Sequence, residues 1–165
     1  MEKVLDRLEL DSSLSELSRA WPWTEALAAG LGLGEQTQFA IQLCLEEALA
    51  NIVLHGYRNR PGHPILVVAS VSGGSLFLAI EDETPPFAPS DLSEQPDRPP
   101  ADLDTREPGG NGIRLMRQFA ASVNYELLPH GNRLTLGFPL APPQRAPASF
   151  ADSTAPLSPQ VAQND

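Results

Sequence analysis

The spacing of apolar and polar residues predicts a chain in which strands alternate with helices. Residues 3–10 are predicted to form a strand, and residues 14–29 a helix behind the possible N-caps of an Asp-Ser-Ser run. Pro22 lies inside that helix and is expected to kink or divide it. The strongest helical segment is 35–57, which is apolar nearly all round, so we expect it to be largely buried.

Apolar, β-branched runs predict four further strands. Residues 65–71 and 75–81 flank a Ser-Gly-Gly turn, and residues 123–128 and 133–140 flank a Pro-His-Gly-Asn turn. An amphipathic helix over 111–122 fits the segment before the closing pair of strands. This order predicts an α+β fold, a two-layer α/β sandwich in which a mixed, mostly antiparallel sheet carries its helices on one face.

Two proline-rich segments show neither the apolar period of a helix nor that of a strand. Residues 83–110 hold seven of the 17 prolines without a core pattern, and loops of this length are commonly functional lids or disordered. Residues 141–165 bury too little apolar surface to offset the entropy of ordering them. The sequence therefore predicts one domain over 1–140 with a lid at about 83–110. The segment 141–165 is expected to be a flexible tail, with a docking peptide as the alternative.

Charge and cysteine content exclude several classes of partner. The 165 residues include 21 acidic and 11 basic side chains, a net charge of −10. That balance argues against general binding of DNA or RNA and against a polybasic membrane anchor. The single cysteine forms no internal disulfide and no zinc cluster. No stretch approaches the ~20 apolar residues of a membrane span, and charges interrupt the N-terminus, so a cytoplasmic protein is expected.

Three polar residues interrupt the apolar helix at a regular spacing. Glu47, Asn51 and His55 lie at i, i+4 and i+8, which places them on one stripe. One interpretation is that this stripe is a solvated edge of the helix, where Glu46 and Glu47 face water. The other is the floor of a site, because buried polar groups need partners. An amide oxygen there could ligate Mg²⁺, and the carboxylate could orient or deprotonate a nucleophile.

A glycine-rich turn precedes the helix predicted at 111–122. The sequence from 108 to 113 is Pro-Gly-Gly-Asn-Gly-Ile. Glycines allow close approach of the backbone, and a helix N-terminus favours phosphate. The Lys-Ser/Thr ending of a Walker A loop is absent. Taken alone, a plain connection from loop to helix explains this turn equally well.

Taken together and in this order, the motifs resemble those of a known family. Residues 46–57, with Glu47, Asn51 and then His-Gly-Tyr, resemble the N-box of the Bergerat-type ATP-binding fold. Residues 80–89 and 109–116 resemble its first and second glycine boxes, and residues 131–136 resemble its closing strand. The resemblance spans residues 3–140. It is strongest to the anti-sigma-factor and switch-protein serine kinases of the GHKL superfamily, which also includes histidine kinases.

The resemblance implies roles for individual residues. Glu47 would be the catalytic general base toward a serine hydroxyl, Asn51 would bind Mg²⁺ at the ATP phosphates, and Asp82 would accept a hydrogen bond from the adenine amino group. The remaining nucleotide-binding positions that it implies are His55, Phe87, Gly109, Gly110, Asn111, Gly112, Ile113 and Thr135. One position departs from the family pattern: Thr84 stands where Asp-x-Gly would have its glycine, which is expected to weaken ATP binding or reshape the loop.

The function implied by the resemblance is that of an ATP-dependent protein serine kinase in a bacterial partner-switching module. Its substrate would be a STAS-domain antagonist, it would also bind a sigma factor or other regulatory target, and it would form a homodimer. A catalytically weak or inactive module that sequesters a partner is the alternative; Thr84 favours it and the intact Glu47 and Asn51 pair opposes it. A detached histidine-kinase ATPase domain is a third possibility, although no phosphoacceptor helix pair precedes residue 35.

Overall fold

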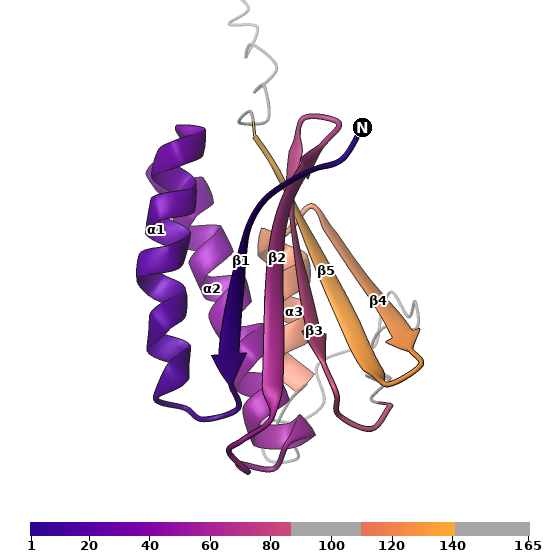
Figure 1. Cartoon of the computed structure of the whole chain (residues 1–165). Coiled ribbons are helices and arrows are strands. Elements are labelled where there is room, and N and C mark those ends of the chain that lie inside the picture. Colours follow the sequence, from indigo (N-terminus) through magenta and orange to yellow (C-terminus); the bar gives the residue numbers. More distant parts are fainter. Residues whose placement is uncertain (87–109, 141–165) are drawn as a thin grey trace, which may run out of the picture.

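Five antiparallel strands form one layer of the molecule, and the described helices form the other (Figure 1). The computed structural model describes residues 1–86 and 110–140, without the side chains of residues 110 and 111. The strands lie in the order β1-β2-β3-β5-β4, and every described pairing is antiparallel. Their bounds are Lys3–Asp11 (β1), Pro64–Ser72 (β2), Ser75–Asp82 (β3), Ser122–Leu128 (β4) and Gly131–Pro139 (β5). The predicted two-layer α+β sandwich is confirmed, with a sheet that is antiparallel rather than mixed in these residues.

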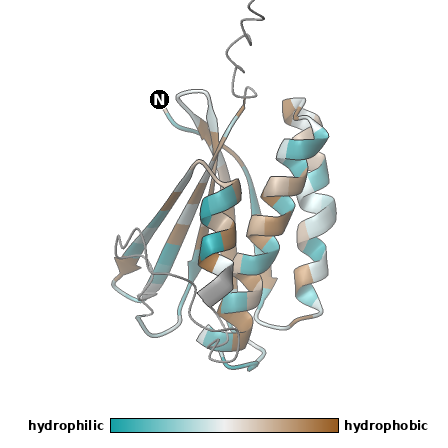
Figure 2. Cartoon of the chain, turned by 180° about the vertical axis from the view of Figure 1, so that it is seen from behind, coloured by the Kyte–Doolittle hydropathy of each residue, from teal (hydrophilic) through white to brown (hydrophobic). Residues whose placement is uncertain are grey.

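Helices α1 (Ala20–Leu31), α2 (Glu35–Asn51) and α3 (Gly110–Phe119) cover one face of the sheet. Seen from behind, the three lie in front of the sheet with α2 in the middle (Figure 2). Alternate residues of β3 (Leu76, Leu78 and Ile80) are fully buried against this helix layer, as a strand with one covered face requires. No helix of residues 1–86 and 110–140 is both long and apolar enough to cross a membrane.

The first predicted helix is divided, as its proline suggested. A 3-10 turn over Glu16–Arg19 (η1) comes first, and α1 begins at Ala20. Pro22 therefore lies in the first turn of α1, where a backbone N–H would have no partner within the helix. The proline marks the start of the α-helix rather than a kink in its middle.

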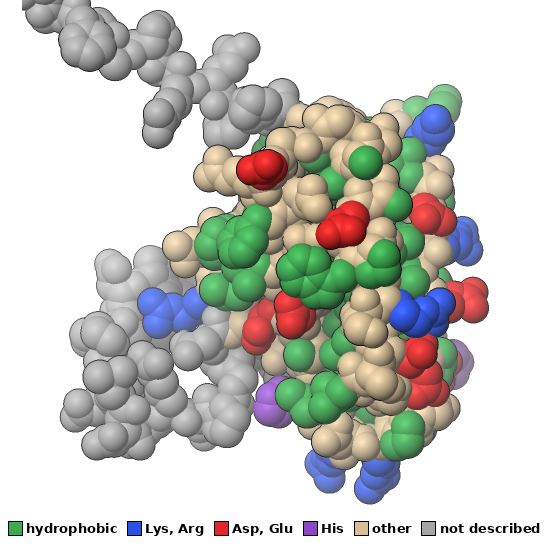
Figure 3. Space-filling model, turned by 90° about the vertical axis from the view of Figure 1, so that its left-hand side faces the viewer, with side chains coloured by type: hydrophobic (Ala, Val, Ile, Leu, Met, Phe, Trp, Pro, Cys, Tyr) green, Lys and Arg blue, Asp and Glu red, His purple; other side chains and the backbone are tan. Residues whose placement is uncertain are grey.

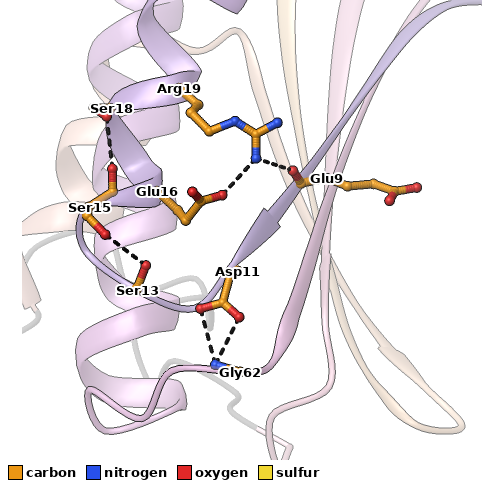
Figure 4. Close-up of polar contacts among 8 residues, drawn as sticks. All are labelled: Glu9, Asp11, Ser13, Ser15, Glu16, Ser18, Arg19 and Gly62. Atoms are coloured by element: carbon orange, nitrogen blue, oxygen red, sulfur yellow. Dashed lines mark hydrogen bonds and ion pairs between the residues drawn. The ribbon is translucent and has the colours of Figure 1, made fainter.

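Polar contacts hold the loop after α2 to the end of β1 (Figure 4). The backbone N–H of Gly62 donates to both carboxylate oxygens of Asp11, at 2.9 and 3.1 Å. Nearby, the guanidinium of Arg19 donates to the carbonyl of Glu9 at 3.1 Å and to the carboxylate of Glu16 at 2.7 Å. These bonds fix the lower end of the molecule, where α2 passes into the sheet.

The outer surface of the helix layer carries exposed apolar side chains with acidic ones between them (Figure 3). A groove of about 360 Å³ lies between η1, α1 and α2, and Leu14, Trp21 and Glu46 are among its lining residues. Gln42 also lines this groove; its amide Nε2 is buried and has no acceptor among the described residues. A buried donor without a partner lowers stability.

Gln42→Leu is therefore expected to raise the free energy of unfolding by about 1 kcal/mol, because it removes the unpaired amide and keeps the volume. Denaturant unfolding of the full chain measures the change. Gln36→Leu, at an exposed position of the same helix, is the matched control and should change stability little. A loss of stability in Gln42→Leu would mean that this amide has a partner.

Candidate functional site

The predicted polar stripe and the predicted glycine turn meet in the structure. Glu47 and Asn51 are half-buried on α2, and they face the first turn of α3 at Gly112. A Cβ built on Gly112 would collide with Oε1 of Glu47 and would lie 2.8 Å from Nδ2 of Asn51. Real Cβ atoms essentially never approach that closely, so with any other residue at position 112 these two side chains or α3 would have to move. The contact joins residues that are far apart in the sequence.

The charges at this contact suit an anion and a hydroxyl group. The first N–H groups of α3 have no partner within the helix and carry partial positive charge. Helix α3 has no acidic residue in its own first turn, so the nearby carboxylate comes from Glu47 on α2. Within residues 1–86 and 110–140, no three His, Cys, Asp or Glu side chains group to hold a metal. A Mg²⁺ ion would instead need the oxygen of Asn51 together with ligand phosphates, a sparse protein ligand set that Mg²⁺ commonly accepts.

The stripe ends at Asn51, because the helix changes type there. Ile52–Gly56 forms a π-helical turn (η2), in which the N–H of Tyr57 donates to the carbonyl of Ile52 at 2.8 Å. Such turns often occur at functional sites. A π-helical turn closes i→i+5 hydrogen bonds, so the i+4 spacing of a regular α-helix does not extend to His55. His55 is exposed, and it lines a cavity of about 580 Å³ whose lining includes neither Glu47 nor Asn51. The structure therefore brings Glu47 and Asn51 together beside Gly112, while the role of His55 stays a prediction.

A second polar cluster surrounds Asp82, where β3 ends. Its Oδ1 accepts hydrogen bonds from the backbone N–H of Thr84 at 2.8 Å, from the Thr84 hydroxyl at 2.5 Å and from Nδ2 of Asn132 at 3.0 Å. Asp82 is only 9% exposed, so its carboxylate needs such donors. The predicted base-binding residue thus lies at the sheet end in a buried, hydrogen-bonded position.

Tyr57 holds the chain that leaves this cluster. Its hydroxyl accepts a bond from the N–H of Glu83 at 2.8 Å and donates to the carbonyl of Pro64 at 2.9 Å. Burial raises the pKa of Tyr57, and the charges of Asp82 and Glu83 raise it further, against the opposing effect of the Glu83 bond. Tyr57 therefore keeps its proton and remains a donor at neutral pH.

Thr84, which departs from the family pattern, packs against Gly56 of η2, where the missing side chain of the glycine leaves room for it. Thr84 is 4% exposed, and a Cβ on Gly56 would lie 2.6 Å from its Cγ2 atom. Its hydroxyl meanwhile bonds to Asp82. The side chain that this chain adds at position 84 is thus packed and hydrogen-bonded, and the effect on ATP affinity remains a prediction.

Gly56→Ala is accordingly expected to lower the free energy of unfolding by about 1–3 kcal/mol, because the added methyl overpacks Thr84. Thr84→Gly in the same chain removes the clashing atom. Thr84→Gly has its own cost, because it removes a buried, hydrogen-bonded side chain. In the Thr84→Gly background, Gly56→Ala should therefore cost much less than it does in wild type, and a double-mutant cycle by thermal or denaturant unfolding measures this difference. Additive effects of the two changes would contradict this packing.

The remaining predicted residues are placed as follows. Ile113 is 9% exposed and packs in the hydrophobic core. Gly110 and Asn111 start α3, but their side chains, and all of Phe87 and Gly109, lie outside the described residues, as does most of the predicted lid. These positions keep their roles as predictions.

The sheet register corrects the expectation for Thr135. Thr135 pairs with Ala79 and Asn124, on the face of the sheet opposite the helices, so it does not reach Asp82. The residue directly across from Asp82 is Asn132. Sequence reasoning missed Asn132 because it assigned this residue to a turn and began the strand at 133, whereas β5 begins at Gly131. The sequence signal that could have placed Asn132 in the strand is its pairing with Gly131 at the start of the closing hairpin strand.

Comparison with known proteins identifies the family. A model of the histidine kinase-like ATPase domain matches residues 10–138. Serine/threonine-protein kinase BtrW of Bordetella bronchiseptica is 32% identical over 144 residues, which cover 86% of this chain and 99% of that protein. Anti-sigma F factor of Clostridium kluyveri is 30% identical over 90 residues, 52% of this chain and 58% of that protein.

A solved structure agrees on the fold. The structure of the RsbU and RsbW domains of Rv1364c from Mycobacterium tuberculosis superposes on this chain with a TM-score of 0.54 and 17% sequence identity. The match covers 82% of this chain and 33% of that longer chain. The family model covers most of the chain. The chain therefore belongs to the histidine kinase-like ATPase domain family, in the branch of the switch-protein serine/threonine kinases and anti-sigma factors.

Proposed function

We propose that this protein is an ATP-dependent protein serine kinase of a partner-switching module, with a STAS-domain antagonist as its substrate. The observation that carries the proposal is the contact of Gly112 with Glu47 and Asn51, which sets a helix N-terminus against a carboxylate and an amide. Similarity to a serine/threonine-protein kinase over most of the chain supports the same activity.

In this proposal each residue has one task. The N–H groups at the start of α3 bind phosphate oxygens, and the amide oxygen of Asn51 holds Mg²⁺. Mg²⁺ supplies neutralisation of phosphate charge when it is bound. Glu47 accepts the proton of the substrate serine hydroxyl while the serine oxygen bonds to the γ-phosphorus and the bond from that phosphorus to ADP breaks. Positioning of the two reactants then provides most of the acceleration.

The partners and the compartment belong to the same proposal. Anti-sigma F factors are relatives over about half of this chain, which supports binding of a sigma factor or another regulatory target. We further propose a homodimer. Because the reaction consumes ATP, the protein would act in the cytoplasm.

Transfer of phosphate to a defined partner tests the proposal. The full chain is incubated with Mg²⁺, γ-labelled ATP and the STAS-domain protein encoded beside it, and phosphoserine on that protein is measured. The proposal predicts labelled serine that accumulates with time. If the STAS protein binds but remains unlabelled, the chain is instead a binding module that sequesters its partner, which is the function that Thr84 at the first glycine box would favour.

A further inference from the structure

We infer that Asn132 is a positioning residue that holds Asp82 for recognition of the nucleotide base. The inference rests on the proposed nucleotide site and adds to it a residue and a means of base selection. Asn132 is 2% exposed, and it lies directly across the sheet from Asp82, with its side chain on the face that the helices cover. Its place in the sheet is therefore fixed from both neighbouring strands.

The amide of Asn132 is oriented by bonds at both of its ends. Its Oδ1 accepts a hydrogen bond from the hydroxyl of Tyr125 on β4. Its Nδ2 lies 3.0 Å from Oδ1 of Asp82 and 2.8 Å from the hydroxyl of Thr84, with the carbonyls of Thr84 and Pro85 at 3.1 and 3.4 Å. A side-chain amide with its acceptor end engaged by a donor must present its NH₂ group to the carboxylate.

The side-chain hydrogen bonds that the described residues donate to the Asp82 carboxylate all end on Oδ1. Thr84 and Asn132 together direct three donors to Oδ1, and no donor of the described residues reaches Oδ2. The first oxygen is thus occupied and the carboxylate cannot rotate without breaking these bonds. Oδ2 remains as an acceptor for a ligand.

A fixed oxygen that only accepts hydrogen bonds discriminates between purine edges. A 6-amino group can donate to Oδ2, whereas the 6-oxo group of guanine would place one acceptor against another. Sites that are built around a buried polar group reject analogues that leave this group unpaired. If Asn132 is lost, Asp82 gains freedom to turn, so the advantage of the 6-amino base should shrink.

Calorimetric titration of the full chain with Mg·ADP and with Mg·GDP tests this inference. Wild type should prefer ADP. Asn132→Ala should weaken ADP binding about tenfold and change GDP binding much less, so that the ratio of the two dissociation constants falls. Tyr125→Phe, which removes only the hydroxyl that orients the amide, should move the ratio in the same direction by a smaller factor. Asn124→Ala, at an exposed position of β4, is the control and should leave the ratio unchanged.

The possible results separate this inference from the proposed function. If Asn132→Ala and Tyr125→Phe weaken both nucleotides by equal factors, their role is only structural and the inference is wrong, while the kinase proposal stands. A wild-type chain that binds ADP and GDP equally well overturns the inference in the same way. If wild type binds neither nucleotide, the proposed function fails together with it.

Discussion

Gly112→Ala is expected to reduce ATP affinity by a factor of about 10–100. The added methyl would collide with Oε1 of Glu47 and lie 2.8 Å from Nδ2 of Asn51, so either α3 or both side chains must move. Overpacking of this kind typically costs about 1–3 kcal/mol, which corresponds to that factor if it falls on the bound state. Calorimetric titration with ATP and Mg²⁺ measures the change.

The same substitution should be mild for the helix itself. Alanine is a better helix former than glycine by about 1 kcal/mol, so a loss of affinity in Gly112→Ala cannot come from weak helix formation. Gly30→Ala is the matched control, since Gly30 is also helical and a Cβ there meets nothing within 4 Å. ATP affinity equal to wild type in Gly112→Ala would show that the start of α3 does not belong to the site.

Glu47→Gln is expected to slow phosphoryl transfer by a factor of about 10²–10⁴, the usual contribution of a general base. The amide keeps the size of the carboxylate but does not take up the serine proton. ATP affinity should therefore change only a few-fold, and the loss should appear in the rate of single-turnover transfer to the STAS protein.

Glu46→Gln provides the control for the change of charge. Glu46 precedes Glu47 in the chain, but it is exposed and lines the groove toward α1 instead of facing Gly112. Its replacement should leave the transfer rate near that of wild type. Equal slowing in both variants would assign the effect to net charge, and an unaffected rate in Glu47→Gln would remove Glu47 from the role of base.

The hydrophobic pattern predicted most of the described fold because the pattern and the covered face of the sheet coincide. Alternate residues of β3 (Leu76, Leu78 and Ile80) are buried, and the apolar α2 lies between its neighbours in the helix layer. Pro22 marked a boundary that the structure shows at the start of α1. Local preference and tertiary packing favour the same elements here.

Two features of the site could not be read from local spacing. The stripe of Glu47, Asn51 and His55 assumed a regular helix, whereas the residues after Asn51 form a π-helical turn and His55 is exposed. The place of Asn132 depends on the strand register, which joins it to Asp82 across the sheet. Register and close approach, such as that of Gly112 to Glu47, arise from packing between segments that are distant in sequence.

In the proposed site, Asn51 lies beside the start of α3 and binds nucleotide phosphates through Mg²⁺. Titration of ATP into wild type and Asn51→Ala, with Mg²⁺ and with EDTA, tests it most directly. We expect Mg²⁺ to tighten ATP binding in wild type. Asn51→Ala should bind ATP weakly and without a response to Mg²⁺, while its unfolding midpoint stays near that of wild type. If Asn51→Ala binds Mg·ATP as tightly as wild type, Asn51 does not hold the metal and the proposed site is wrong.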